Sequence, residues 1–165
     1  MLLLVWLVSS CDMETKFERK TAKNGLFSLE IADYLKEASE LNKTASLQYS
    51  NEQKEVYIIV IDDSKKEIGD SYDLKSYFEF ASGNIKGGIK DAKLSTPTTK
   101  DVNGMKLMVG EITGSFNDIG VYYILATVES KDNFYQVLTW TMEKNKDSFG
   151  KDMMKMVESI KEEKK

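Results

Sequence analysis

Val56-Tyr-Ile-Ile-Val-Ile61 is an unbroken run of β-branched and aromatic residues. Residues of these types favour strands, and a run without polar alternation is typical of a strand that is covered on both faces. We therefore expect this segment to lie inside a β-sheet with packed layers on both sides. The fold then depends on which other segments supply the remaining strands and the covering helices.

Further strands are indicated on both sides of this run. Asn24-Gly25 marks a turn into the first of them. Asn103-Gly104 is a strong hairpin signal, because both residues tolerate positive φ. Pro97 has no N–H to donate, which predicts an edge or bulged strand around it. The predicted strands cover residues 26–31, 44–49, 56–61, 92–101, 105–116, 120–129 and 133–142.

Two helices are predicted from apolar residues at three- and four-residue spacing. The first begins after Asp73, a good N-cap, and ends at Gly87-Gly88. The second begins near Lys146 and should cover the sheet face that carries Leu138 and Trp140. The apolar stripes are Leu74, Tyr77, Phe78, Ala81 and Ile85 in the first helix, and Phe149, Met153, Met156, Val157 and Ile160 in the second.

The first eleven residues resemble the end of a lipoprotein signal peptide. An uncharged apolar run leads to Val8-Ser-Ser-Cys11, which is similar to a lipobox, and a charged segment follows at once. The run is too short to span a bilayer as a helix. We expect residues 1–10 to be removed as a lipoprotein signal peptide and Cys11 to carry lipid. The alternative is a buried N-terminal strand in which Cys11 is an ordinary small apolar residue.

The remaining chain is expected to form one domain. Residues 11–23 comprise the lipidated cysteine and a charged tether, and residues 24–162 form a single α+β domain. We expect this domain to fold without residues 1–23. The predicted class is α+β: an antiparallel β-sheet meander with a helix after the early strands and a C-terminal helix packed on the sheet.

Composition restricts the chemistry. The 165-residue chain has no histidine and one cysteine, which excludes Ser–His–Asp and Cys–His catalysis and zinc sites built from His and Cys. The net charge is −4, and lysines alternate with acidic residues throughout, so we expect no nucleic-acid binding. Carboxylate pairs and a Ser–Lys dyad remain possible.

Residues 62–73 are acidic, but their spacing lacks the central glycine and final glutamate of a calcium loop. We expect no cofactor and no bound metal.

The order of these elements resembles the PsbP/Mog-like fold. The resemblance covers about residues 24–162 and implies a non-catalytic binding or assembly factor, since members of that fold are mostly of this kind. Bacterial members are often small secreted lipoproteins. The segments that carry the resemblance are Gly25–Ile31, the helix from Asp73 to Ile85, Gly104–Gly110, Tyr135–Trp140 and the helix from Phe149 to Ile160.

The function hypothesis is therefore a lipid-anchored, non-enzymatic binding or assembly module on the periplasmic or extracellular face of the cell envelope. Its expected partners are the membrane, through the anchor, and an envelope protein; the chain itself is expected to be a monomer. One alternative is a carboxylate-dependent hydrolase of envelope glycans or peptides, and another is an accessory factor of a membrane complex.

Tyr122 and Tyr123 must point to opposite faces of a strand, so one could be exposed. The candidate ligand-binding residues are Tyr34, Tyr72, Tyr122 and Tyr123.

Overall fold

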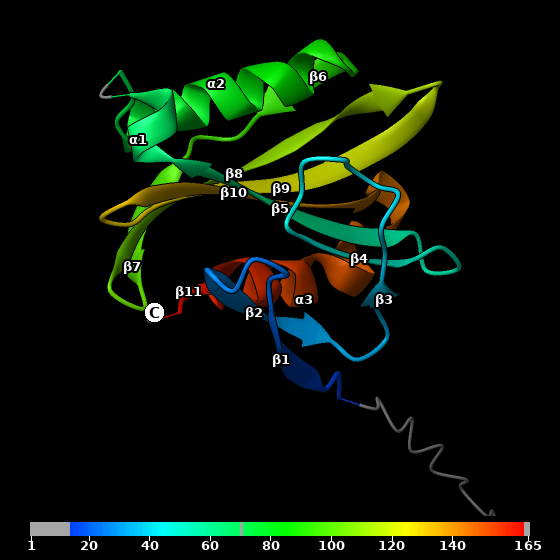
Figure 1. Cartoon of the computed structure of the whole chain (residues 1–165). Coiled ribbons are helices and arrows are strands. Elements are labelled where there is room, and N and C mark those ends of the chain that lie inside the picture. Colours follow the sequence, from blue (N-terminus) through cyan, green and yellow to red (C-terminus); the bar gives the residue numbers. More distant parts are fainter. Residues whose placement is uncertain (1–13, 70, 164–165) are drawn as a thin grey trace, which may run out of the picture.

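A large antiparallel sheet runs through the middle of the molecule, with one helix on its upper face and a second helix and a small sheet on its lower face (Figure 1). The computed structural model describes residues 14–69 and 71–163. The signal-peptide prediction for residues 1–10 and the lipidation of Cys11 therefore lie outside the described residues.

The elements follow the predicted order, with a few additional short ones. The helices are α1 (Lys65–Ile68), α2 (Leu74–Gly87) and α3 (Lys146–Glu158), and a short 3-10 helix covers Glu143–Asn145. The strands are β1 (Phe17–Thr21), β2 (Phe27–Ala32), β3 (Lys36–Glu37), β4 (Leu47–Asn51), β5 (Val56–Ser64), β6 (Lys90–Leu94), β7 (Thr98–Val102), β8 (Met105–Phe116), β9 (Ile119–Glu129), β10 (Asn133–Met142) and β11 (Lys161–Glu162).

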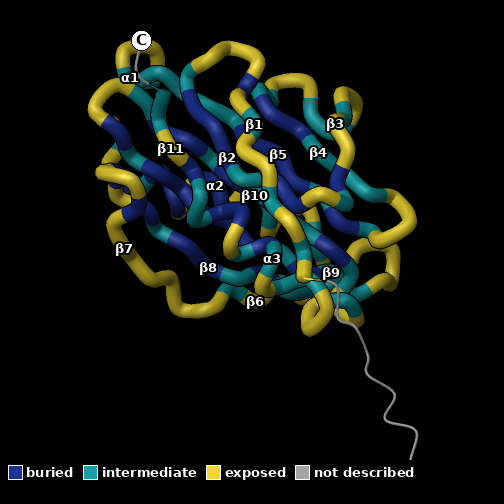
Figure 2. Tube along the Cα trace, turned by 90° about the horizontal axis from the view of Figure 1, so that it is seen from below, coloured by how far each residue is buried: buried dark blue, intermediate teal, exposed yellow. Residues whose placement is uncertain are grey.

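The large sheet has the order β3-β4-β5-β10-β9-β8-β6, and β7 also pairs with β8. The small sheet has the order β1-β2-β11. The apolar run Val56–Ile61 lies in β5, between β4 and β10. Val56, Ile58, Ile59 and Val60 are all buried, as predicted for a strand covered on both faces. Figure 2 shows that buried residues are concentrated along the inner strands, whereas β7 and the turns are exposed.

The turn residues act as the sequence indicated. Asn103 and Gly104 have φ of 47° and 80°, and they join β7 to β8 with Val102 opposite Met105. Pro97 lies between β6 and β7, so the single strand predicted over 92–101 is divided in two. Both pieces pair only with β8, at the edge of the sheet. The missing N–H of proline explains this interruption.

Helix α2 begins with a capping box. The carboxylate of Asp73 accepts from the Ser76 N–H at 2.7 Å, and the Ser76 hydroxyl accepts from the Asp73 N–H at 2.9 Å. Phe78 and Ala81 of its apolar stripe pack on Ile112 and Leu125 of the large sheet. The predicted start, end and buried face of this helix are confirmed.

Helix α3 buries the predicted stripe, but against the other face of the sheet. Met153, Met156 and Val157 of α3 have no exposed surface, and neither has Ile160, which follows the C-cap Ser159 because the helix ends at Glu158 and not at the predicted Ile160. All four belong to one core with Tyr135 and Val137 of β10 and with β2. Leu138 instead packs in the cluster of α2. The prediction that α3 covers Leu138 and Trp140 is therefore wrong. Strand alternation separates the two faces, but it does not say which helix covers each one.

The tether predicted over residues 11–23 is wrong for its second half, because Phe17–Thr21 forms β1. Phe17 lies opposite Ala32 and Thr21 opposite Ser28 in an antiparallel ladder with β2. The charged side chains of β1 reach solvent or ion partners, as in the 3.3 Å pair of Arg19 with Glu30. Backbone pairing, and not an apolar face, holds this strand, so hydrophobic periodicity gave no sign of it.

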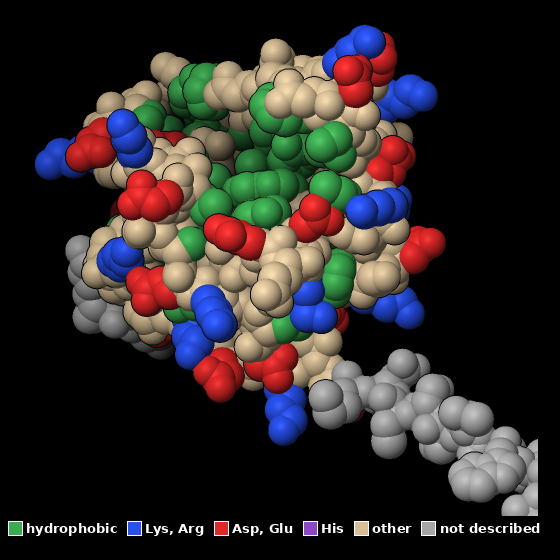
Figure 3. Space-filling model, turned by 90° about the vertical axis from the view of Figure 1, so that its right-hand side faces the viewer, with side chains coloured by type: hydrophobic (Ala, Val, Ile, Leu, Met, Phe, Trp, Pro, Cys, Tyr) green, Lys and Arg blue, Asp and Glu red, His purple; other side chains and the backbone are tan. Residues whose placement is uncertain are grey.

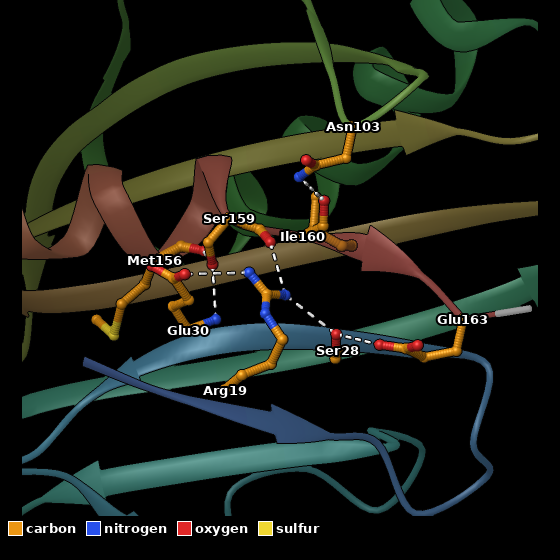
Figure 4. Close-up of polar contacts among 8 residues, drawn as sticks. All are labelled: Arg19, Ser28, Glu30, Asn103, Met156, Ser159, Ile160 and Glu163. Atoms are coloured by element: carbon orange, nitrogen blue, oxygen red, sulfur yellow. Dashed lines mark hydrogen bonds and ion pairs between the residues drawn. The ribbon is translucent and has the colours of Figure 1, made fainter.

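A polar network fastens β1 and β2 to the end of α3 (Figure 4). The Arg19 guanidinium donates to the Ser28 hydroxyl at 3.0 Å and to the Ser159 carbonyl at 3.2 Å. The Ser159 hydroxyl in turn accepts from the Glu30 N–H at 2.8 Å. These bonds satisfy polar groups at the helix end and join residues that are far apart in the sequence.

The first prediction concerns residues 14–23. A protein that begins at Asn24 loses the β1 ladder, the packing of Phe17 and the buried Ala22, so its free energy of unfolding should fall by more than about 2 kcal/mol relative to one that begins at Glu14. Urea denaturation of the two proteins measures this difference. Equal midpoints would show that β1 contributes nothing to stability and would restore the tether interpretation.

The second prediction concerns α3 and the buried residue that follows it. Ile160→Ala, two residues after the end of α3, removes a fully buried side chain, which should cost about 2–5 kcal/mol. Met154→Ala should cost clearly less, because Met154 is only partly buried beside the same core. Thermal denaturation of both variants compares them. Greater damage from Met154→Ala would mean that the register of α3 is wrong.

Candidate functional site

Part of the upper face of the large sheet is not covered by α2. Near the β8–β9 turn this face carries seven apolar side chains that we call the aromatic surface. Figure 3 views the molecule from the right-hand side of Figure 1 and shows hydrophobic side chains gathered in the middle of that side, with acidic side chains next to them. The aromatic surface comprises Tyr57, Phe116, Ile119, Val121, Tyr123, Trp140 and Met142.

Strand register brings these residues together from four strands. Trp140 of β10 lies opposite Tyr57 of β5 on one side and Tyr123 of β9 on the other. The Trp140 ring stacks on Tyr57 with centroids 5.2 Å apart and planes 12° apart, and lies 6.2 Å from Tyr123. Cross-strand aromatic pairs of this kind stabilise a sheet and leave ring surface available to a ligand.

The β8–β9 turn extends the aromatic surface into solvent. Phe116 and Ile119 are 55% and 47% exposed and lie directly opposite each other. Between them Asn117 and Asp118 have φ of 49° and 64°, the conformation of a two-residue hairpin turn. Together with the Trp140 row, the turn borders a shallow groove of about 180 Å³. Exposed apolar side chains that gather beside a groove make this the candidate site for an interaction.

Acidic residues surround the aromatic surface. Partial burial raises the pKa of the Tyr57 phenol, and the nearby carboxylates of Glu52 and Glu55 raise it further. Asp118 is exposed in the turn, and Glu55 lines the groove itself. Lys144, with its Nζ 4.0 Å from Glu55, offsets only part of this charge. The site is therefore an apolar floor with a negative rim.

The tyrosines predicted from the sequence do not form one site. Tyr34 lies on the lower side, where its ring is 5.7 Å from Phe149 and its hydroxyl donates to Asp152 at 3.3 Å. Tyr72 packs beside α2, against Tyr77 and Phe80. For both residues ligand binding stays a prediction.

The adjacent pair Tyr122 and Tyr123 is divided between the two faces, as expected. Tyr122 is 2% exposed, faces the α3 core and lies under Lys146, whose Nζ is 4.6 Å from the ring centroid. The proposal that Tyr122 contacts a ligand is therefore wrong, because the side chain is inaccessible. Tyr123 belongs to the aromatic surface.

Sequence reasoning missed Tyr57, Trp140, Phe116 and Ile119. One signal was available: Phe116-Asn-Asp-Ile119 places two large apolar residues on either side of a tight turn, where polar residues are usual. Tyr57 and Trp140 gave no such signal, because aromatic residues in strands are most often covered. Their exposure depends on where α2 ends.

The described residues offer no comparable catalytic site. Three acidic residues of the 62–73 region have structural partners: Asn24 donates to Asp62, Tyr77 donates to Asp63, and Asp73 caps α2. Within residues 14–69 and 71–163, no group of three or more Asp, Glu or Cys residues is arranged to hold a metal ion.

Two larger hollows lie elsewhere, of about 980 and 570 Å³. Both are lined by side chains of both charges. Lys65, which lines the hollow of about 980 Å³, pairs with Glu129 at 2.7 Å. Arg19, which lines the hollow of about 570 Å³, pairs with Glu30. These ion pairs and the network in Figure 4 give the hollows a structural explanation.

Solved structures with the same architecture identify the fold. A solution structure of cyanobacterial PsbP (CyanoP) from Synechocystis has a TM-score of 0.63 and 12% identity, covering 93% of this chain and 97% of that one. The fold is PsbP-like. LpqN of Mycobacterium tuberculosis, described as involved in cell envelope biogenesis, has a TM-score of 0.66 and 13% identity over 93% of this chain and 94% of that one.

A further PsbP-like neighbour is a protein of unknown function from Pseudomonas aeruginosa, with a TM-score of 0.54, 10% identity and coverage of 87% of this chain and 95% of that one. No family model and no curated protein matches the sequence. The predicted PsbP/Mog-like α+β class is confirmed, and at these identities the likeness concerns the fold alone. Across the described residues, no helix has the length and apolar character needed to cross a bilayer.

The third prediction uses Trp140 as a reporter. The chain has two tryptophans, Trp6 and Trp140, so a protein beginning at Glu14 retains only Trp140. Tyr57→Ala removes the stacked ring and should shift Trp140 emission to the red and increase its quenching by acrylamide. Phe80→Ala, at a 47% exposed position beside Tyr72, should change neither. Unchanged emission in Tyr57→Ala would contradict the stacked arrangement.

Proposed function

We propose that this protein is a lipid-anchored, non-catalytic module of the bacterial cell envelope that binds a partner protein through the aromatic surface. The observation that carries the proposal is the partly exposed row of Tyr57, Trp140 and Tyr123, which the exposed side chains of Phe116 and Ile119 extend into solvent. A folded domain gains nothing in stability from placing large apolar side chains in solvent at a turn. The PsbP-like fold and the lipobox-like Val8–Cys11 support the envelope location.

The chemistry of the site indicates the class of partner. An apolar floor buries aliphatic or aromatic side chains, and exposed tyrosine and tryptophan rings attract cations to their faces. The carboxylates of Glu52, Glu55 and Asp118 add a negative rim. The partner segment that complements this surface is apolar and carries Lys or Arg.

The hydrolase alternative has less support. A catalytic acid near neutral pH needs a raised carboxyl pKa in a cleft. The pKa values of Glu18, Asp73 and Glu162 are shifted downward. A hydrogen bond from Lys20 lowers the pKa of Glu18, and hydrogen bonds from Ser76 lower the pKa of Asp73. Partial burial raises the pKa of Glu162, but hydrogen bonds outweigh it and lower the pKa overall; they come from Ser130, Tyr135 and Asn133. These three groups are stabilised as anions, which suits structural roles.

A peptide selection tests this proposal, as the fourth prediction. Random peptides displayed on phage are selected on the protein, and the enriched sequences should combine Lys or Arg with Leu, Ile or aromatic residues. Synthetic versions should change Trp140 emission and should bind more weakly as salt is raised, because the rim is charged. The double variant Phe116→Ser, Ile119→Ser should weaken binding at least tenfold.

The matched control is Phe80→Ser, which removes an equally exposed apolar side chain from α2, outside the aromatic surface. It should bind the selected peptides as the wild type does. Selection of peptides without cationic residues, or equal binding by the double variant, would contradict the proposal.

A further inference from the structure

We infer that the lipid on Cys11 holds the α3 side of the domain against the membrane head groups and keeps the aromatic surface turned away from them. The inference rests on the lipid anchor of the proposed function. It deepens that function, because it decides what the aromatic surface can reach. The argument comes from the length of the anchor, the place where it joins the fold and the residues around that place.

The connection between lipid and fold is short. Thr15 is the fourth residue after Cys11, and a fully extended chain spans at most about 3.6 Å per residue, so the two are no more than about 14 Å apart. The lipid joins the chain beneath the head groups, which occupy about 5–7 Å of each leaflet. Thr15 therefore lies within about 10 Å of the membrane surface, instead of at the end of a long tether.

The joining point is fixed on the α3 side of the fold. The Thr15 hydroxyl donates to the Asp152 carboxylate of α3 at 2.8 Å, and the Asp33 N–H donates to the Lys16 carbonyl at 2.8 Å. From Phe17 onward the chain is part of the β1–β2 ladder, which Arg19 fastens to the end of α3 (Figure 4). The domain therefore has no hinge between Thr15 and its core.

The surface around Thr15 has the composition of a membrane interface. Three partly buried aromatic rings lie there, each with a lysine ammonium above it. Lys155 Nζ is 3.9 Å from the Phe17 ring centroid, and Lys54 Nζ is 5.6 Å from Tyr34 and 5.7 Å from Phe149. Each ammonium lies over a ring face as a cation–π contact, and both lysines are exposed, so their charge is available to lipid phosphates.

The aromatic surface lies on the opposite side of the large sheet. Tyr122 faces the α3 core, and its neighbour Tyr123 belongs to the aromatic surface. The α3 layer alone is about 10 Å thick, and the large sheet lies above it (Figure 1). The bilayer that holds the anchor is therefore out of reach of the aromatic surface, and its occupant is a protein segment in the aqueous space.

Fluorescence quenching on vesicles tests this orientation and is the fifth prediction. The protein beginning at Cys11 is coupled through this single cysteine to a maleimide lipid in phosphatidylcholine vesicles that contain a nitroxide-labelled head group. Trp140 of the wild type should be quenched weakly. The Phe149→Trp variant in a Trp140→Phe background places the reporter beside Lys54, and its quenching should be several times stronger. Equal quenching, or stronger quenching of Trp140, would overturn the inference.

A lengthened anchor provides the control. Inserting about twenty Gly and Ser residues after Asp12 adds a flexible segment with a root-mean-square span of about 25 Å, so the difference between the two reporters should largely disappear. A difference that persists would also overturn the inference, because anchor length would then not set the orientation. Chemical coupling makes this result independent of lipidation in the host, which fatty-acid labelling of wild type and Cys11→Ser tests separately.

Discussion

The upper face of the large sheet is longer than the helix that covers it. Helix α2 has 14 residues and is about 21 Å long, whereas the twelve residues of β8 extend for about 40 Å. Helix α2 packs on Ile112 and Leu125, and soon after its end Lys90 lies opposite Ser115 at the β8 edge of the sheet. Tyr57 of β5 and Trp140 of β10 are not part of the cluster that α2 forms with the sheet, and this uncovered part of the face carries the aromatic surface.

The lower face is organised differently. There α3 lies with β2 over a single continuous core, and the chain ends, β1 and β11, flank β2 in the small sheet. The two ends of the described chain thus lie on the same side of the large sheet, joined by Arg19, Ser159 and the Ser28–Glu163 hydrogen bond. One face is closed and structural, and the other is only partly closed and available for binding.

This asymmetry suits a protein that is anchored at one side and binds at the other. The proposed lipid anchor on the closed side would leave the open side directed into the aqueous space, where the rim of Glu55 and Asp118 would favour the basic apolar segment proposed as its partner. PsbP-like neighbours of 10–13% identity share the layered architecture. Because a fold hosts many functions, the case for binding rests on the residues of the aromatic surface itself.

Local chemistry in the sequence was sufficient for much of the fold. The Asn103-Gly104 turn, the Asp73 cap, the edge position of the segment around Pro97 and the apolar stripe of α3 each depend on a few neighbouring residues, and all are found in the structure. Likewise, the alternation of a strand determined that Tyr122 and Tyr123 lie on opposite faces.

Only the tertiary structure decided which face each helix covers, how far it extends over that face, and whether a charged segment joins a sheet. The sequence did not reveal β1, because backbone hydrogen bonds to β2 hold it without an apolar pattern. Nor did it reveal that Trp140 is uncovered and Tyr122 buried, because both have the same strand propensity. Exposure is set by contacts between residues far apart in the chain, and these contacts leave no local pattern.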